Sequence, residues 1–120
     1  MGGELWDTGF APGTASGAQV NAPGTRRAGV EFVVPSVTSG NTGDGKGGAA
    51  GARAEEASRR AKNPHVKHAD MVGHGYGVLE VDAAQARFQF RTVDKLNPNS
   101  GVETTKALRT PAGQPVIETL

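Results

Sequence analysis

Polar and apolar residues alternate most regularly between residues 86 and 94, and this alternation predicts an antiparallel strand. Phe88 and Phe90 fall on one face of that segment, while the residues between them are polar or charged. Residues 75–82 also have strand character, and the four residues 82–85 that separate the two segments are a common length for a hairpin connection. We therefore predict a β-hairpin that presents its phenylalanines to the core.

Further strands are predicted on either side of this hairpin. Residues 28–34 are rich in β-branched side chains and apolar on both faces, which is typical of a short buried strand, and Pro35 ends it. Residues 102–109 predict a weaker strand, and residues 115–120 predict a short final one. The apolar residues expected to form the core are Val30, Phe32, Val34, Leu79, Val81, Phe88 and Phe90.

A helical pattern occupies residues 49–62. Its alanines recur at helical spacing and are expected to line one apolar face: Ala50, Ala54, Ala57 and Ala61. Glu55 and Glu56 each have an arginine four residues later, an orientation that favours ion pairs along the helix surface. The Asn-Pro pair at residues 63–64 is expected to end the helix.

Two segments lack any sustained period. Residues 1–27 are dominated by Gly, Pro, Ser, Thr and Asn, which predicts a glycine- and proline-rich loop region. Residues 40–48 are expected to form a flexible hinge because most of them are glycine or asparagine. The predicted fold class is α+β, with a mainly antiparallel sheet, one alanine-rich helix and long glycine-rich loops, and residues 28–120 hold the predicted elements.

Composition and charge narrow the class of protein. With 18 glycines, seven prolines and 36% hydrophobic residues, the chain buries little apolar surface per residue, which favours contacts with another body. The net charge of +1 gives no nucleic-acid footprint. Neither a membrane-spanning apolar run nor a secretory signal peptide is recognisable. The absence of cysteine excludes disulfides and thiolate metal sites.

All three histidines lie close together in the sequence, at His65, His68 and His74. With Asp70 they supply residue types that bind metal ions. Pro64 and the alternating glycines after the segment disfavour a helix, and residues three apart in an extended segment point to opposite faces. We expect loop and strand-edge histidines, and a small histidine-dependent metal-binding protein stays as an alternative.

Other catalytic patterns are absent. Residues 43–51 look superficially like a phosphate-binding loop, but the spacing differs and Gly47 follows Lys46 where a hydroxyl residue would bind Mg²⁺. This stretch therefore predicts a flexible linker. Serine and threonine hydroxyls at residues 36–39 would act as nucleophiles only beside a base, which the sequence does not assign.

Three stretches in this order carry a family resemblance: residues 29–39 (GVEFVVPSVTS), residues 63–82 (NPHVKHADMVGHGYGVLEVD) and residues 86–118. They resemble the C-terminal portion of the alkaline phosphatase D family, which are metal-dependent phosphomonoesterases and phosphodiesterases. The "NPH" segment followed by "GY" is its most specific part. The likeness covers residues 28–120.

The resemblance implies a C-terminal fragment of a larger, two-sheet metallophosphoesterase-like enzyme, inactive by itself. The catalytic part, which would be the partner of this fragment, lies in the missing N-terminal portion of that enzyme. The parent enzyme would use divalent or mixed metal ions such as calcium and iron, act on phosphate esters, and be periplasmic or secreted. No catalytic, cofactor-binding or metal-binding residue is expected within this chain.

The residues expected at the rim of the cleft, or behind its metal ligands, are Asn63, His65, Ser36, Thr38 and Ser39. His65 corresponds to the histidine of the family's "NPH" segment and is expected to hydrogen-bond to backbone or to a carboxylate there. Its alternative role is to cap the end of the preceding helix. A stand-alone β-rich binding or structural module without catalysis is the alternative function.

Overall fold

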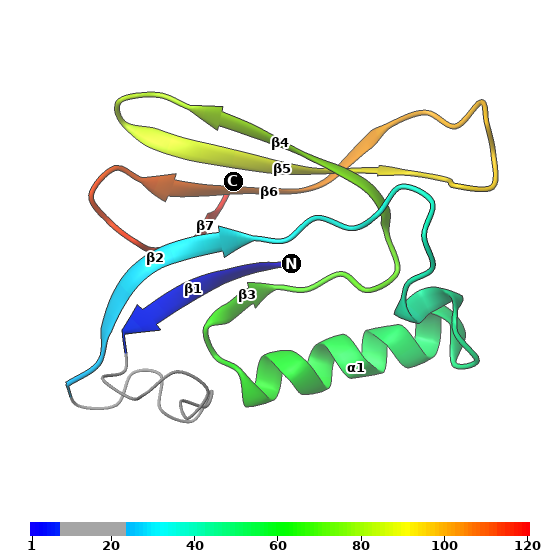
Figure 1. Ribbon diagram of the computed structural model, residues 1–120, viewed down its shortest axis with the longest axis horizontal. Coiled ribbons are helices and arrows are strands. Elements are labelled where there is room, and N and C mark those ends of the chain that lie inside the picture. Colours follow the sequence, from blue (N-terminus) through cyan, green and yellow to red (C-terminus); the bar gives the residue numbers. More distant parts are fainter. Residues whose placement is uncertain (8–23) are drawn as a thin grey trace.

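The computed structural model describes residues 1–7 and 24–120 of the chain. Its elements in chain order are β1 (Gly2–Asp7), β2 (Arg26–Phe32), the 3-10 helix η2 (Thr42–Asp44), α1 (Gly48–Lys62), β3 (Val66–His68), β4 (His74–Val81), β5 (Gln85–Val93), β6 (Glu103–Pro111) and β7 (Glu118–Thr119) (Figure 1).

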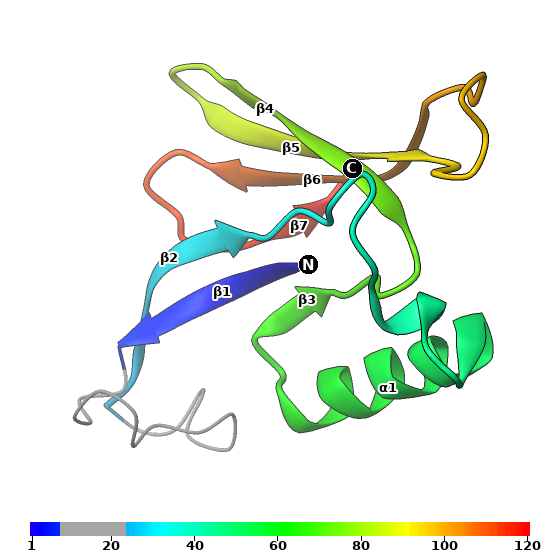
Figure 2. The ribbon, with the colours of Figure 1, turned by 45° about the vertical axis from the view of Figure 1, so that its right-hand side comes forward.

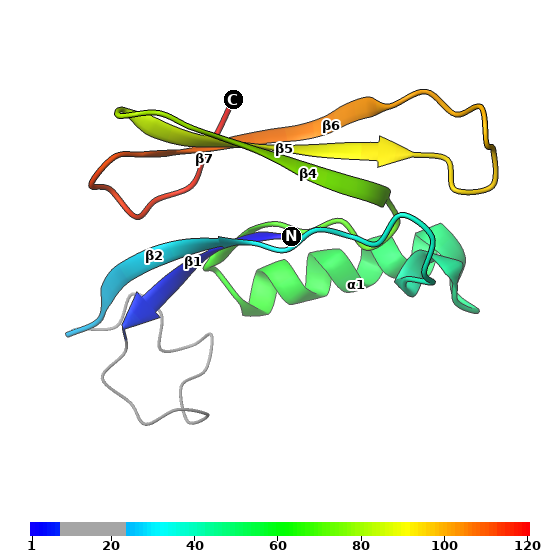
Figure 3. The same cartoon turned by 45° about the horizontal axis from the view of Figure 1, so that its top comes forward.

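The strands form two antiparallel sheets. One has the order β2-β1-β3, and the other has the order β4-β5-β6-β7. Figure 3 shows the two sheets as separate layers, and Figures 1 and 2 place α1 beside β3. The mainly antiparallel sheets and the one α-helix found among residues 1–7 and 24–120 confirm the predicted α+β class.

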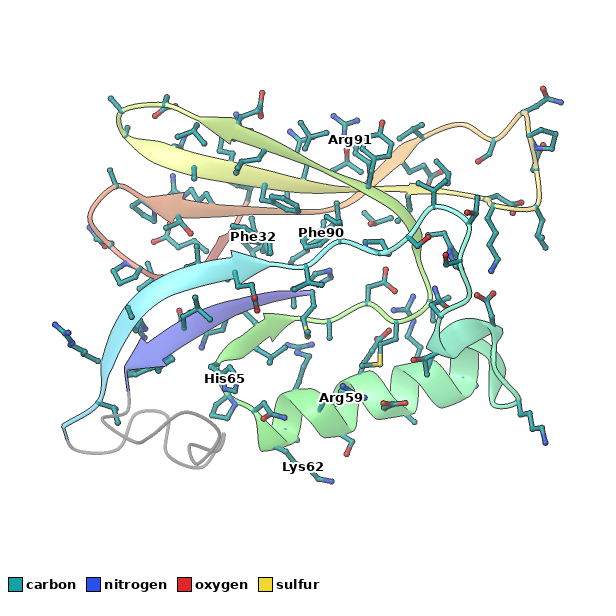
Figure 4. The ribbon with its side chains drawn as sticks, in the orientation of Figure 1. Phe32, Arg59, Lys62, His65, Phe90 and Arg91 are labelled. Carbon is teal, nitrogen blue, oxygen red and sulfur yellow. The ribbon has the colours of Figure 1, made fainter. Side chains whose placement is uncertain are left out.

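The core lies between the two sheets and is built around aromatic rings. Phe32 on β2 stacks on Phe88 on β5, with ring centroids 4.5 Å apart, and Phe90 meets Phe88 edge-on at 4.9 Å. Figure 4 shows Phe32 and Phe90 in the middle of the molecule. Leu108 on β6 is 1% exposed and completes the buried cluster, with Ile117 packed against it. The predicted orientation of Phe88 and Phe90 toward the core is confirmed.

Three residues expected in the core are exposed instead. The exposed fractions are 47% for Val34, 56% for Leu79 and 71% for Val81. Strand β2 ends at Phe32, so Val34 lies in the connection that follows it. Leu79 and Val81 lie on β4, which is the edge strand of its sheet and has a neighbour on one side only. The prediction for these three residues was wrong. The pattern of polar and apolar residues shows which side chains share one face of a strand, but it does not show whether another element covers that face.

Strand β1 corrects the loop expected at the start of the chain. It forms the middle strand of its sheet, pairing with β2 on one side and β3 on the other. Its Glu4 is 3% exposed and accepts hydrogen bonds from Arg27 Nε at 3.0 Å and from the backbone N–H of Ile117 at 3.3 Å. This carboxylate therefore connects the two sheets. Residues 8–23 of the expected loop region lie outside the described residues.

Helix α1 confirms the predicted helix but presents a different face. The alanines expected to be buried are exposed, namely Ala50, Ala54, Ala57 and Ala61. The inward-facing residues are Ala52, which is 1% exposed, and Glu56, which is 8% exposed. Glu56 accepts from the backbone N–H of Met71 at 2.7 Å and from Arg53, three residues earlier in the helix, at 3.0 Å, so it does not form the expected pair with Arg60. The expected pair of Glu55 with Arg59 is present. The helix thus packs through a hydrogen-bonded glutamate rather than an alanine stripe.

Candidate functional site

The segment between β2 and α1 forms an ordered turn where a flexible hinge was expected. Asn41 begins η2, and its side-chain oxygen accepts from the backbone N–H of Asp44 at 3.3 Å. The Asp44 carboxylate accepts in return from the backbone N–H of Asn41 at 2.8 Å, which completes a capping box. Gly43 also donates to the backbone oxygen of Met71 at 2.9 Å. These bonds fix the turn against the connection between β3 and β4.

His74, the first residue of β4, lies against this turn and is 7% exposed. Its Nδ1 lies 3.2 Å from the backbone oxygen of Ser36. Its Nε2 lies 3.0 Å from Nδ2 of Asn41 and 3.1 Å from Oδ2 of Asp44. Lys95 joins this group through Asp44. We call the four residues Asn41, Asp44, His74 and Lys95 the His74 cluster.

The glycine that follows His74 allows β4 to lie close against β5 at this point. Gly75 has a φ of +156°, a conformation that side-chain-bearing residues rarely adopt. A Cβ at Gly75 would collide with the backbone carbonyl of Arg91 on β5. The N–H of Gly75 donates to the backbone oxygen of Ser36 at 3.3 Å, which holds the serine-rich connection against β4.

Asp44 and Lys95 form the charged part of the cluster. Nζ of Lys95 donates to Oδ2 of Asp44 at 2.6 Å. This hydrogen bond, helped by the one from the backbone of Asn41, lowers the pKa of Asp44 to about 2. Asp44 is therefore a carboxylate at any pH near neutrality.

Arg53 and Asp70 form a second charged pair beside the cluster. Nη1 of Arg53 lies 3.3 Å from Oδ1 of Asp70, which also accepts from the backbone N–H groups of Val72 and Gly73 at 2.9 Å. Burial raises the pKa of Asp70, but these amide hydrogen bonds and the charge of Arg53 outweigh burial, so its pKa lies below the ordinary value. The hydrogen bond to Glu56 raises the pKa of Arg53.

These charged groups surround a surface pocket of about 400 Å³. Among the residues that line it are Asp44, Arg53, Asp70, His74, Asp94 and Lys95. Each cation in its wall already has a carboxylate partner, since Lys95 binds Asp44 and Arg53 binds Asp70. The wall of the pocket therefore combines both signs of charge.

The residues expected at the cleft rim fall into two separate places. The hydroxyl of Ser36 accepts from the backbone N–H groups of Thr38 at 3.2 Å and Ser39 at 2.9 Å, so it stabilises the turn in which it lies. This turn lies next to His74, through the backbone oxygen of Ser36. Asn63 and His65 lie at the other end of α1, beyond Lys62 (Figure 4). The structure does not bring these two groups together.

Asn63, and not His65, caps the end of α1. Nδ2 of Asn63 donates to the backbone oxygen of Arg59 at 2.8 Å. The backbone oxygen of His65 accepts from Glu4 at 2.9 Å, which attaches the segment to β1. Nδ1 of His65 is buried and has no hydrogen-bond partner among residues 1–7 and 24–120.

The three histidines have three different environments. His68 packs its ring against Phe90, with centroids 4.9 Å apart, and burial lowers the pKa of His68. His74 contacts the η2 turn, while His65 lies at the end of α1. Within the described part of the chain, no group of three His, Cys, Asp or Glu side chains is arranged to hold a metal ion. The described residues therefore do not fit the metal centre that the family resemblance implies for the parent enzyme.

The partners of His74 were not predicted from the sequence. Asn41 and Asp44 are spaced three apart, as the two members of a capping box are, and this spacing was the available signal. Lys95 had no such signal, because only the hairpin brings it to Asp44, 51 positions away.

Within the described residues, no helix combines the length and apolar character that crossing a membrane requires.

Comparison with protein families gives one match that bears on function. The family model described as "PhoD-like phosphatase" matches residues 9–90, which is more than half of the 120-residue chain. The match begins earlier than the resemblance recognised from residue 28, and it ends at Phe90 within the third resembling stretch. No curated protein matches the chain, and no solved structure matches it either. The family match confirms the resemblance, and the chain belongs to the PhoD-like phosphatase family.

Proposed function

We propose that this chain is the C-terminal part of a hydrolase of phosphate monoesters and diesters, and that it does not hydrolyse phosphate esters by itself. The observation that carries the proposal is the separation of its histidines within a chain of a phosphatase family. His68 packs on Phe90, and both ring nitrogens of His74 contact hydrogen-bonding partners in the chain.

The catalytic centre would come from an N-terminal part of the same enzyme. A binuclear metal site needs several carboxylate and imidazole ligands, and when bound it supplies an activated water or orients the phosphate. Calcium and iron are the metal ions we propose for that part. This chain would complete the larger two-sheet fold and contribute the rim of the cleft through Ser36, Thr38, Ser39, Asn63 and His65. We place the parent enzyme in the periplasm or outside the cell.

Uncovered apolar side chains support contact with a further part of the enzyme. Leu79 and Val81 lie on β4 with exposed fractions of 56% and 71%, and Val34 is 47% exposed. Leu79 pairs with Phe88 across the hairpin, so it belongs to the face that carries the core. Apolar side chains that continue a core face beyond its cover are typical of a surface buried by a partner.

An activity assay on the purified chain tests this proposal. A model phosphomonoester and a model phosphodiester are supplied with Ca²⁺, Fe³⁺, Zn²⁺ or Mg²⁺, each with and without a chelator. We expect no turnover above the buffer rate under any of these conditions. Metal-dependent turnover that chelation abolishes, and that co-purifies with the chain through successive columns, would contradict the proposal.

A further inference from the structure

The imidazole of His74 faces two partners that require opposite protonation states. The backbone oxygen of Ser36, 3.2 Å from Nδ1, can only accept a hydrogen bond, so Nδ1 carries a hydrogen in both states. At Nε2, an amide nitrogen of Asn41 lies at 3.0 Å and a carboxylate oxygen of Asp44 at 3.1 Å. A neutral ring accepts at Nε2, whereas a protonated ring donates there.

The amide orientation of Asn41 is fixed by its other neighbours. Its Nδ2 lies 3.0 Å from the backbone oxygen of Val72 and 3.2 Å from that of Gly73, and both oxygens require a donor. Its Oδ1 accepts from the backbone N–H of Asp44. Asn41 therefore presents a donor to Nε2 of His74, and this contact is favourable only when the ring is neutral.

The amide nitrogen of Asn41 has two hydrogens for three acceptors. With a neutral His74, these acceptors are the backbone oxygens of Val72 and Gly73 and the ring nitrogen. Once His74 is protonated, both hydrogens are available to the two backbone oxygens. The ring then donates to Asp44, so every polar group in the contact keeps a partner.

Asp44 is the group through which the change reaches the rest of the molecule. Its Oδ2 already accepts from the backbone N–H of Asn41 at 2.8 Å and from Nζ of Lys95 at 2.6 Å. A protonated His74 adds a third donor to the same oxygen and a positive charge close to Lys95. The other charged groups at the pocket are Asp94 and the pair formed by Arg53 and Asp70. In that pair, each side chain already has the other as its partner of opposite charge.

We propose that protonation of His74 moves its Nε2 hydrogen bond from Asn41 to Asp44 and thereby loosens the bond between Asp44 and Lys95. Lys95 is the second residue of the connection from β5 to β6, and it attaches that connection to Asp44 in the η2 turn, 51 positions earlier in the chain. Leu96, which follows it, is 85% exposed. The pocket therefore contains a pH-dependent switch that releases this connection when the pH falls, and the switch does not depend on the proposed phosphatase function.

Nuclear magnetic resonance on the ¹⁵N-labelled chain tests the switch between about pH 8 and about pH 5, the interval in which histidines commonly change charge. The protonation state of Nε2 of His74 is followed across this interval through its ¹⁵N signal. Over the same interval we expect the Lys95 Nζ signal to be lost and the amide signals of Lys95 and Leu96 to shift.

Two sets of variants assign the response. His65→Gln combined with His68→Gln leaves His74 as the remaining histidine, and we expect the shifts at Lys95 and Leu96 to persist. His74→Gln is expected to abolish them. Asp44→Asn keeps the imidazole and removes the acceptor, so the ring should still be protonated while the response at Lys95 disappears; this variant decides the matter if His74→Gln does not fold.

Three results would overturn the switch. The first is an Nε2 of His74 that keeps one protonation state throughout the interval. The second is a Lys95 response that disappears with His65 and His68 rather than with His74. The third is a Lys95 response that is unchanged in Asp44→Asn, because the carboxylate would then play no part in the coupling.

Discussion

Asp44 shows how one exposed side chain can make the fold sensitive to acid. Lys95 holds the pKa of Asp44 at about 2, below the ordinary range for an aspartate. A carboxyl group with a lowered pKa stabilises the folded state above its ordinary pKa, and this stabilisation is lost as the pH falls toward the lowered value. The contribution of Asp44 is therefore complete near neutrality and is lost between about pH 4 and about pH 2.

Lys95→Met should reduce this acid sensitivity, since it removes the ammonium group and keeps most of the side-chain stem. We expect the variant to be less stable than the wild type while His74 is neutral. The difference should shrink as the pH falls, first as protonated His74 loosens the bond between Lys95 and Asp44, and then as Asp44 itself is protonated. Denaturant unfolding at several pH values measures it. A difference in the free energy of unfolding that stays constant from neutral pH to about pH 2 would contradict the assigned role of Lys95.

Phe90 and Leu79 test what the alternating pattern can and cannot predict. Phe90 is 4% exposed, so Phe90→Ala should cost about 3–5 kcal/mol, a large part of the roughly 5–15 kcal/mol of a typical domain. Leu79 is 56% exposed, and Leu79→Ala should cost less than about 1 kcal/mol. Urea unfolding of both variants checks this order, and equal losses would show that Leu79 is covered in the isolated chain.

These residues show why the sequence predicted only part of the core. Alternation placed Phe88 and Phe90 on the buried face, but it gave the same status to Leu79 and Val81, because a pattern along one strand does not reveal where the opposite sheet ends. Leu108, 1% exposed, was missed because the polar residues before it in β6 weaken the strand signal. Burial depends on long-range packing, which the local pattern does not contain.

At the level of strands and helices, the hairpin and α1 were predictable, and β1 was not. The hairpin follows from alternation, and the helix follows from its spacing and the Asn63 stop. Strand β1 begins with Gly2 and Gly3, and its buried Glu4 has distant partners in Arg27, Lys67 and Ile117. A glycine pair and a charged residue indicate a loop when the local sequence alone is considered. The strand is stabilised instead by its pairing with β2 and β3.

The hairpin depends on a glycine that lies against the core. A Cβ at Gly77 would collide with the Phe88 ring and with Cγ1 of Val34. Gly77→Ala should therefore destabilise the chain by about 1–3 kcal/mol, the usual cost of overpacking. Gly51→Ala in α1 is the matched control, because a Cβ there meets nothing within 4 Å, and it should stabilise the helix by about 0.5–1 kcal/mol.

Thermal unfolding of the two alanine variants shows whether the added methyl group at each glycine acts mainly by overpacking the folded state or by reducing the flexibility of the unfolded chain. The prediction is that the two midpoints move in opposite directions from the wild type. If Gly77→Ala were as stable as Gly51→Ala, that result would contradict the close packing of Gly77 against Val34 and Phe88.

Considered as a whole, the molecule joins a small aromatic core to a hydrogen-bonded cluster at one end of α1 and to uncovered apolar residues along β4. The family resemblance was visible in the sequence, and the family match confirms it. The candidate site was not visible, because the contacts of Asn41 and Asp44 with His74, and of Lys95 with Asp44, join residues that lie far apart in the sequence. The expected rim residues are divided between the two ends of α1, so the described residues do not bring them together at one site.

Complementation tests this account most directly. Phosphodiester turnover is measured for the chain, for the N-terminal part of the parent enzyme, and for their mixture, all with calcium and iron present. The account predicts turnover in the mixture alone, rising with the concentration of this chain and weakened by Leu79→Ser combined with Val81→Ser. Full turnover by this chain without the N-terminal part would contradict the account, and so would full turnover by the N-terminal part without this chain.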